Sequence, residues 1–236
     1  MSTRTVTENF DMLGGLFNQF ACSEWRTFDK EDLSYEYVAA CLTDMISDMN
    51  ADQNICLDWN TVDDEGKTLA FYMLKEYPQP IMVDALRHLN VNLRHTTHAG
   101  DTLLHEVCAC HEVIRGEIGH HAKITHLCIK KLCEHLDINT RNDCGETPIF
   151  MVQYTKDVPI LFAYSAFRAA IDAMIECGAD IFIQDNNGRY FTDFCKTTHS
   201  PIARCLDNER IAIERHILNT VAQAHAVHNT TKGRKI

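Results

Sequence analysis

The stretch LDINTRNDCGETPIF (residues 136–150) contains the pattern that decides the fold. Its glycine, Gly145, has counterparts in Gly66, Gly100 and Gly188, each in the same local frame. An apolar residue lies seven positions before each glycine, and Asp or Asn lies eight positions before it. Thr stands two positions after the first three glycines, and Tyr after the fourth. Such self-similarity indicates repeated units that pack against their neighbours.

The chemistry of a turn that leads into a helix explains the glycine and the residues after it. Glycine adopts a positive φ without strain, as a tight turn requires. We expect the Thr after each turn, such as Thr147, to cap the next helix by accepting a backbone N–H hydrogen bond. Pro148 then falls in the first helical turn, where its missing N–H costs nothing. Each unit is therefore predicted to be a turn followed by a helix.

This pattern resembles the ankyrin repeat. The resemblance rests on Gly178-Ala-Asp-Ile181, Gly145-Glu-Thr-Pro148 and Thr102-Leu-Leu-His105, which match successive parts of that repeat, and it spans residues 57–200. It implies an all-α ankyrin-repeat solenoid of about four irregular repeats, with finger-like turns between helix pairs. It also implies a hydrogen-bonding structural role for His105.

Two intervals depart from the family's period of about 33 residues. The four glycines are 34, 45 and 43 residues apart, so the second and third intervals are longer. We place inserts near residues 111–122 and 153–164, and expect them to extend or loop out between the two helices of their repeats. Tyr190-Phe191 stands where Thr-Pro is expected, as suits a terminal unit.

Helical segments are predicted on both sides of the repeats. Residues 1–56 form an acidic N-terminal cap of two amphipathic segments, and residues 201–227 form a capping helix at the other end. Residues 228–236 are polar and basic, which predicts a flexible tail.

The negative charge lies at one end of the chain. Residues 1–66 contain 14 acidic and 3 basic side chains, whereas residues 67–236 are balanced. Such an end suits a partner protein with a basic surface and does not suit the phosphates of nucleic acid. The alternative is that the charge only keeps the chain in solution.

The eleven cysteines are scattered and odd in number, and we see no signal peptide before them. No apolar run reaches the roughly 20 residues that a membrane helix needs. Free cysteine behaves as a small buried hydrophobe. We therefore expect a cytoplasmic, reducing location and no membrane partner.

The ankyrin resemblance implies a protein-binding module that is not an enzyme and needs no cofactor. Partners would dock on the fingertips and the concave inner-helix face. The candidate contacts are the polar residues of the predicted tips: Asp63, Asp64, Glu65, Thr97, His98, Asn142, Asp143, Asp185, Asn186 and Asn187. Acidic and amide groups there can accept hydrogen bonds from a partner's Lys or Arg. The alternative is that they serve turn geometry alone.

The irregular repeats and the many Cys and His residues also resemble ankyrin proteins that intracellular bacteria and large DNA viruses deliver into host cells. This likeness implies an effector that acts on host proteins, in which case the location is the host cytosol.

Cysteine and histidine gather between residues 105 and 128. Thiolates and imidazoles are the ligands that zinc prefers, although the spacing here matches no standard zinc finger. The weak candidate ligands are Cys108, Cys110, His111, His120 and His121. A zinc-stabilised protein, or an enzyme with a cysteine nucleophile beside histidine, is the alternative to a binding module. The simpler interpretation places Cys108 on the apolar face of an inner helix.

Overall fold

The computed structural model describes residues 5–24, 34–53, 56–109, 118–152, 170–194 and 218–219 of the 236-residue chain. Helices and turns make up these residues, which confirms the all-α prediction for this part of the chain. The β pairing within them is limited to two isolated bridges, Val62–Thr68 and Gln184–Tyr190. None of the helices in this part of the chain is long and apolar enough to span a membrane.

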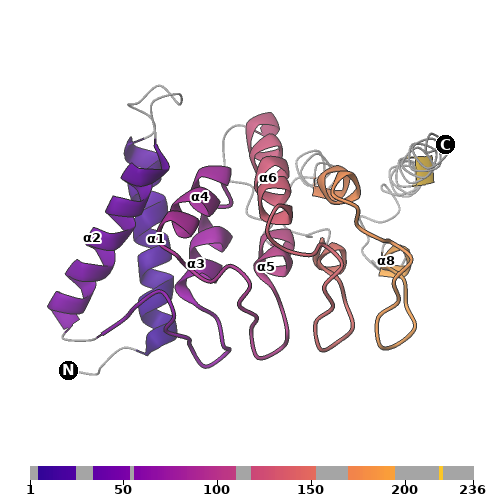
Figure 1. The fold of residues 1–236 in the computed structure, drawn as a ribbon, viewed down its shortest axis with the longest axis horizontal. Coiled ribbons are helices and arrows are strands. Elements are labelled where there is room, and N and C mark those ends of the chain that lie inside the picture. Colours follow the sequence, from indigo (N-terminus) through magenta and orange to yellow (C-terminus); the bar gives the residue numbers. More distant parts are fainter. Residues whose placement is uncertain are drawn as a thin grey trace, which may run out of the picture.

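The helices stand in two rows along the long axis of the molecule (Figure 1). The inner row consists of α1 (Val6–Glu24), α3 (Leu69–Glu76), α5 (Leu103–Ala109), the 3-10 helix η1 (Pro148–Met151) and α8 (Phe191–Phe194). The outer row consists of α2 (Tyr35–Gln53), α4 (Pro80–His88), α6 (Ile118–Cys133) and a helical segment at residues 170–176. Successive members of the inner row pack on one another, as do α2, α4 and α6.

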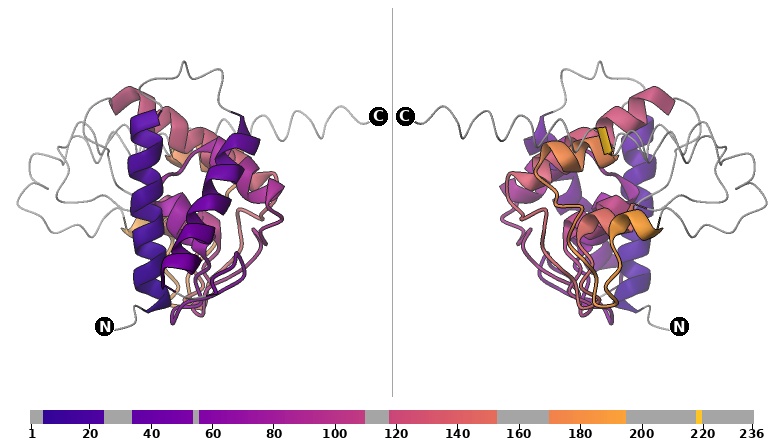
Figure 2. Two further views of the ribbon diagram at one scale, coloured as in Figure 1. Left: turned by 90° about the vertical axis from the view of Figure 1, so that its left-hand side faces the viewer. Right: turned by 90° about the vertical axis from the view of Figure 1, so that its right-hand side faces the viewer.

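Four turns lead from the outer row back to the inner row, and all lie along one edge of the molecule (Figure 1). Viewed along the stack in Figure 2, they lie one behind another. Their glycines are Gly66, Gly100, Gly145 and Gly188, with φ between +74° and +79°. The positive φ predicted for these glycines is confirmed.

The apolar core runs between the rows. Phe10, Phe71, Phe150 and Phe191 bring a fully buried ring from each of four inner-row helices. All six residues from 69 to 74 of α3 are buried, because α3 has inner-row neighbours on both sides and α4 behind it. Helices this short are marginal alone and depend on such packing.

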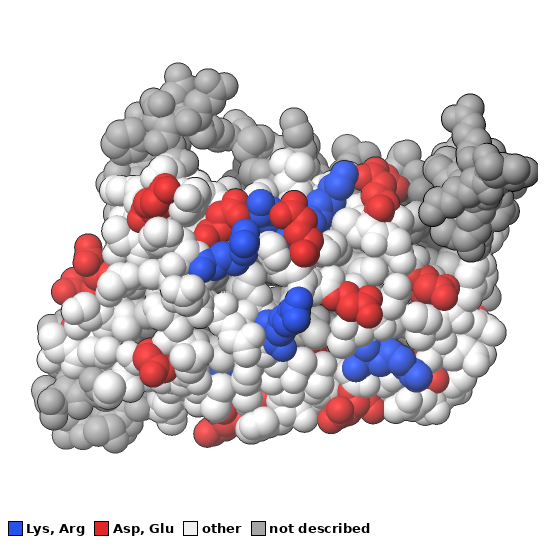
Figure 3. All heavy atoms as spheres, in the orientation of Figure 1, with Lys and Arg blue, Asp and Glu red and all other residues white. Residues whose placement is uncertain are grey.

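A band of alternating charge crosses the outer row on the face shown in Figure 3. Lys131 of α6 reaches Asp84 of α4 at 3.2 Å. Lys130 pairs in the other direction with Glu176, at 2.7 Å. These pairs are partly exposed, so each contributes little, but they join three successive outer elements.

The expected threonine caps are wrong at two of the three positions. Thr68 and Thr147 have the extended backbone of an N-cap, yet neither side chain makes a capping hydrogen bond. The backbone N–H that such a cap would use, three residues later, donates instead to the Thr carbonyl, at 3.0 Å in Phe71 and 2.9 Å in Phe150. Both hydroxyls are buried without a partner among the described residues. The hydroxyl of Thr102 instead lies 2.9 Å from the ring of His105, three residues further on.

The two predicted inserts are described only in part. Residues 118–122 are helical and form the first turns of α6, so this end of the first insert lengthens an outer helix. The rest of that insert and all of 153–164 lie outside the described residues. So do the tail at 228–236 and most of the predicted capping helix, of which residues 218 and 219 are described and helical.

Candidate functional site

A short polar side chain, three residues before each glycine, holds each of the four turns. We call these residues the anchors: Asp63, Thr97, Asn142 and Asp185. In every turn an anchor side-chain oxygen accepts the backbone N–H groups two and four residues further on, at 2.8 to 3.3 Å. The anchor's own N–H donates to the carbonyl four residues on, at 2.9 or 3.0 Å. The four turns therefore share one hydrogen-bonding scheme.

The anchors are buried, except for Asn142, which is half-buried. Asp63 also accepts a hydrogen bond from the hydroxyl of Tyr72, and burial together with that carboxylate raises the pKa of Tyr72. Burial raises the pKa of Asp185, but the backbone N–H and the guanidinium of Arg189 outweigh it and hold that pKa at about 2. The side chains of these four predicted contact residues therefore form hydrogen bonds within their own turns.

Backbone hydrogen bonds also join each turn to the next. The N–H of His98 donates to the carbonyl of Glu65, that of Asp143 to Ala99, and that of Asn186 to Cys144. Each bond is 2.9 Å long and joins the same two positions of successive turns. This ladder holds the four turns in register.

The two residues before each glycine form the tips. The predicted contacts among them are all exposed: Asp64, Glu65, His98, Asp143, Asn186 and Asn187. Asn186 is partly engaged, because its amide donates to the Asp143 carbonyl at 2.7 Å and its oxygen accepts from Arg141 at 3.2 Å. The side chains of this row project from a rigid backbone toward solvent.

A hollow of about 170 Å³ opens where the first turn meets the inner row. Charged side chains from four elements line it: Asp11, Glu65, Lys67, Lys75 and Glu106. Lys67 lies between Glu65, at 2.9 Å, and Glu106, at 3.7 Å. Sequence reasoning missed this group because its members are as many as 95 residues apart.

Opposing effects act on the charges of the hollow. Burial raises the pKa of Glu106, and the positive charge of Lys67 opposes this. Burial alone lowers the pKa of Lys67, but its hydrogen bond to Glu65 and the charge of Glu106 outweigh it, and the pKa is raised. Lys67 therefore stays charged, and the hollow presents carboxylate oxygens beside it.

His105 links the second unit to the third turn. Its Nδ1 accepts the backbone N–H of Thr102 at 3.0 Å, so the proton lies on Nε2, which donates to the Glu146 carbonyl at 3.1 Å. The Thr102 hydroxyl lies 2.9 Å from the same Nδ1. Burial lowers the pKa of this ring, which keeps it neutral. His105 thus has a structural role.

The predicted metal ligands are only partly described. Cys108 is buried in the core, where its thiol donates to the sulfur of Met174 at 3.5 Å, and burial raises its pKa. A protonated thiol is a poor metal ligand. Cys110 and His111, and the side chains of His120 and His121, lie outside the described residues. Among those that are described, no group of three His, Cys, Asp or Glu residues is placed to hold a metal ion.

Comparison with protein-family models and with curated proteins finds no match to this chain. Its function therefore has to be inferred from its own geometry.

Proposed function

We propose that this protein is an ankyrin-repeat solenoid that binds another protein through its tips and its inner row. The observation that carries the proposal is the row of four turns, each fixed by an anchor and joined to its neighbours by the ladder. A surface that is ordered before binding loses less conformational entropy when a partner docks. Stacked repeats present such extended surfaces.

The first turn is where we expect the partner's basic groups to dock. Asp64 and Glu65 are exposed there, and the hollow beside them adds the carboxylates of Asp11 and Glu106. Arg and Lys form charge-assisted hydrogen bonds with carboxylates. An acidic surface also accelerates the approach of a basic partner.

The proposed activity is binding, not catalysis. The likeness to delivered ankyrin effectors supports a further proposal, that the partner is a host protein in the host cytosol. The cysteine-rich composition is suited to such a reducing compartment.

Affinity capture from a cell lysate with the full chain tests the proposal. The test variant carries Asp64→Lys and Glu65→Lys. The matched control carries Asp44→Lys and Asp48→Lys, which make the same charge change on exposed positions of α2 in the outer row. We expect the wild type and the control to enrich the same protein, and the test variant to lose it.

Salt provides a second measurement. We expect the affinity for the captured protein to fall steeply above ~0.15 M salt, where the Debye length is about 8 Å. Equal capture by both variants, or an affinity that does not respond to salt, would place the interface elsewhere.

A further inference from the structure

Two cysteines meet where α6 adjoins the next outer element. Cys133 is the last residue of α6, and Cys177 directly follows the helical segment 170–176. They are 44 residues apart in the sequence, but their side chains are hydrogen-bonded to one another. Both are half-buried, so small reagents can reach them from solvent.

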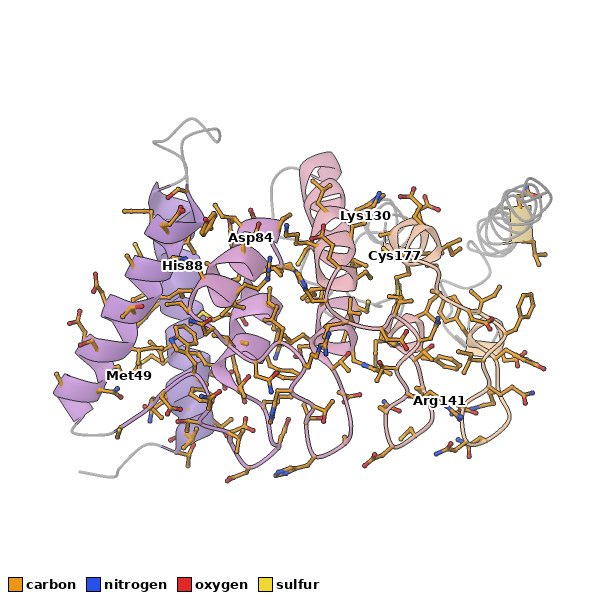
Figure 4. The ribbon with its side chains drawn as sticks, in the orientation of Figure 1. Met49, Asp84, His88, Lys130, Arg141 and Cys177 are labelled. Carbon is orange, nitrogen blue, oxygen red and sulfur yellow. The ribbon has the colours of Figure 1, made fainter. Side chains whose placement is uncertain are left out.

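Contacts on both sides hold these two helix ends together. One turn before Cys133, Lys130 donates to Glu176 at 2.7 Å. After the helices, the Asn139 amide donates to the Gly178 carbonyl at 3.2 Å, and its oxygen accepts the N–H of Asp180 at 2.8 Å. Figure 4 labels Lys130 and Cys177 at this junction. These contacts hold the end of α6 beside the end of the helical segment 170–176.

The two thiols have different acidities. The hydrogen bond from Cys133 lowers the pKa of Cys177, and the charge of Lys130 adds to this effect. The same hydrogen bond, and then burial, raises the pKa of Cys133. Cys177 is therefore the better nucleophile, and Cys133 is placed to react with it in a second step.

We propose that Cys133 and Cys177 form an oxidation site, at which a peroxide converts the dithiol into a disulfide that joins two successive units. The sulfur of Cys177 attacks the peroxide, so that an S–O bond forms, the O–O bond breaks, and the departing oxygen takes the thiol proton as water. The sulfur of Cys133 then attacks the resulting sulfenic acid. The S–S bond forms, the S–O bond breaks, and the leaving hydroxide takes the Cys133 proton as a second water.

The disulfide would fix the junction between the second and third units. Two thiols lose two electrons and two protons, and one peroxide is reduced to two waters. The proposal does not depend on the protein-binding function, because it uses only the outer row.

Peptide mapping of the full chain tests the proposal. The reduced protein is freed of reductant and treated with hydrogen peroxide, and the remaining thiols are then alkylated. We expect mass spectrometry to find a peptide pair linked through Cys133 and Cys177 before any other link, lighter by two hydrogen atoms and separated again by dithiothreitol. The proposal is overturned if both residues are recovered alkylated while the exposed Cys56 and Cys144 are oxidised. It is also overturned if Cys133 links equally to other cysteines.

Two variants and a stability measurement complete the test. Cys177→Ser must abolish the linked peptide, whereas the matched variant Cys144→Ser must leave its yield unchanged. Circular dichroism checks that both variants keep the helical content of the wild type. Oxidation must also raise the midpoint of thermal unfolding of the wild type, because a closed loop restricts the unfolded chain. A rise that persists in Cys177→Ser would assign the effect to another cysteine and reject this site.

Discussion

Asp63 and Asp64 are neighbours of the same residue type in the first turn, yet their side chains have different surroundings. Asp63 is an anchor, with 4% of its surface exposed, and one of its carboxylate oxygens accepts the backbone N–H groups of Glu65 and Lys67. Asp64 is a tip and is exposed. The same division between anchor and tip recurs in all four turns.

The comparison teaches that distance from the glycine, and not residue type, decides what a polar residue does here. Asp, Thr and Asn all serve as anchors, because each has an oxygen on a short side chain that reaches two backbone N–H groups. The tips vary freely in charge. Selection for folding and selection for binding can therefore act on adjacent residues.

The largest effect is expected at Gly66, where the ladder holds the next turn too close for a side chain. In Gly66→Ala the added methyl would lie 2.8 Å from the backbone nitrogen of His98, at a φ of +77°. We expect a loss of about 3 kcal/mol in the free energy of unfolding, measured with urea, from left-handed strain and overpacking together. Gly188→Ala is the matched control, because its φ is +74° but nothing lies within 4 Å. It should lose about 1 kcal/mol, and equal losses would contradict a structural role for the ladder.

The next effect separates anchor from tip directly. Asp63→Ala removes two backbone hydrogen bonds and leaves the Tyr72 hydroxyl without its carboxylate, so we expect a loss of about 2 kcal/mol. Asp64→Ala should change the free energy of unfolding by no more than about 0.5 kcal/mol. Urea unfolding of the two variants side by side measures the difference. Similar values would mean that the division into anchors and tips has no energetic basis.

Acid should weaken the link between the second unit and the third turn. Burial lowers the pKa of His105 below its ordinary value of 6.5, and the hydrogen bond to the Glu146 carbonyl and the charge of Asp101 oppose this only in part. The unfolded chain therefore binds more protons than the native one below about pH 6.5, so the free energy of unfolding falls as the pH drops from there, by at most about 1.4 kcal/mol per pH unit.

Unfolding in urea at a series of pH values measures this loss. His105→Gln should remove part of the slope between pH 6.5 and the folded pKa. His98→Gln, a change at an exposed tip, should keep it. A slope that is unchanged in His105→Gln would assign the acid sensitivity to other groups.

The smallest effect concerns the threonines before the inner helices. Thr102→Val loses the hydroxyl that lies 2.9 Å from His105, and we expect a cost of about 1 kcal/mol. Thr68→Val removes a buried hydroxyl that has no partner among the described residues, so it should be neutral or slightly stabilising. Thermal unfolding of the pair measures both. A larger loss in Thr68→Val than in Thr102→Val would contradict this difference between the two hydroxyls.

Much of the fold was predictable, because it depends on local chemistry. The four glycines predicted the positive φ of the turns, and the resemblance to a helical repeat implied an all-α chain. The threonine caps failed because a backbone carbonyl competes for the same N–H at Phe71 and Phe150, which residue preferences do not show.

The candidate site was harder to predict, because residue type alone does not separate anchors from tips. The missed signal was local: a short acceptor side chain three residues before every glycine. Other contacts join distant parts of the chain. Lys67 lies between Glu65 and Glu106, and Cys133 meets Cys177. Periodicity within one unit carries no information about such contacts.

The ladder also separates length along the chain from distance in space. The glycines are 34, 45 and 43 residues apart, yet the same 2.9 Å bond joins each pair of neighbouring turns. Residues added between the helices of a unit need not alter how the turns are spaced. Foreign loops grafted between the two helices of a unit should therefore leave the tips in place. The stack is thus a scaffold in which these loops and the tips can be engineered independently.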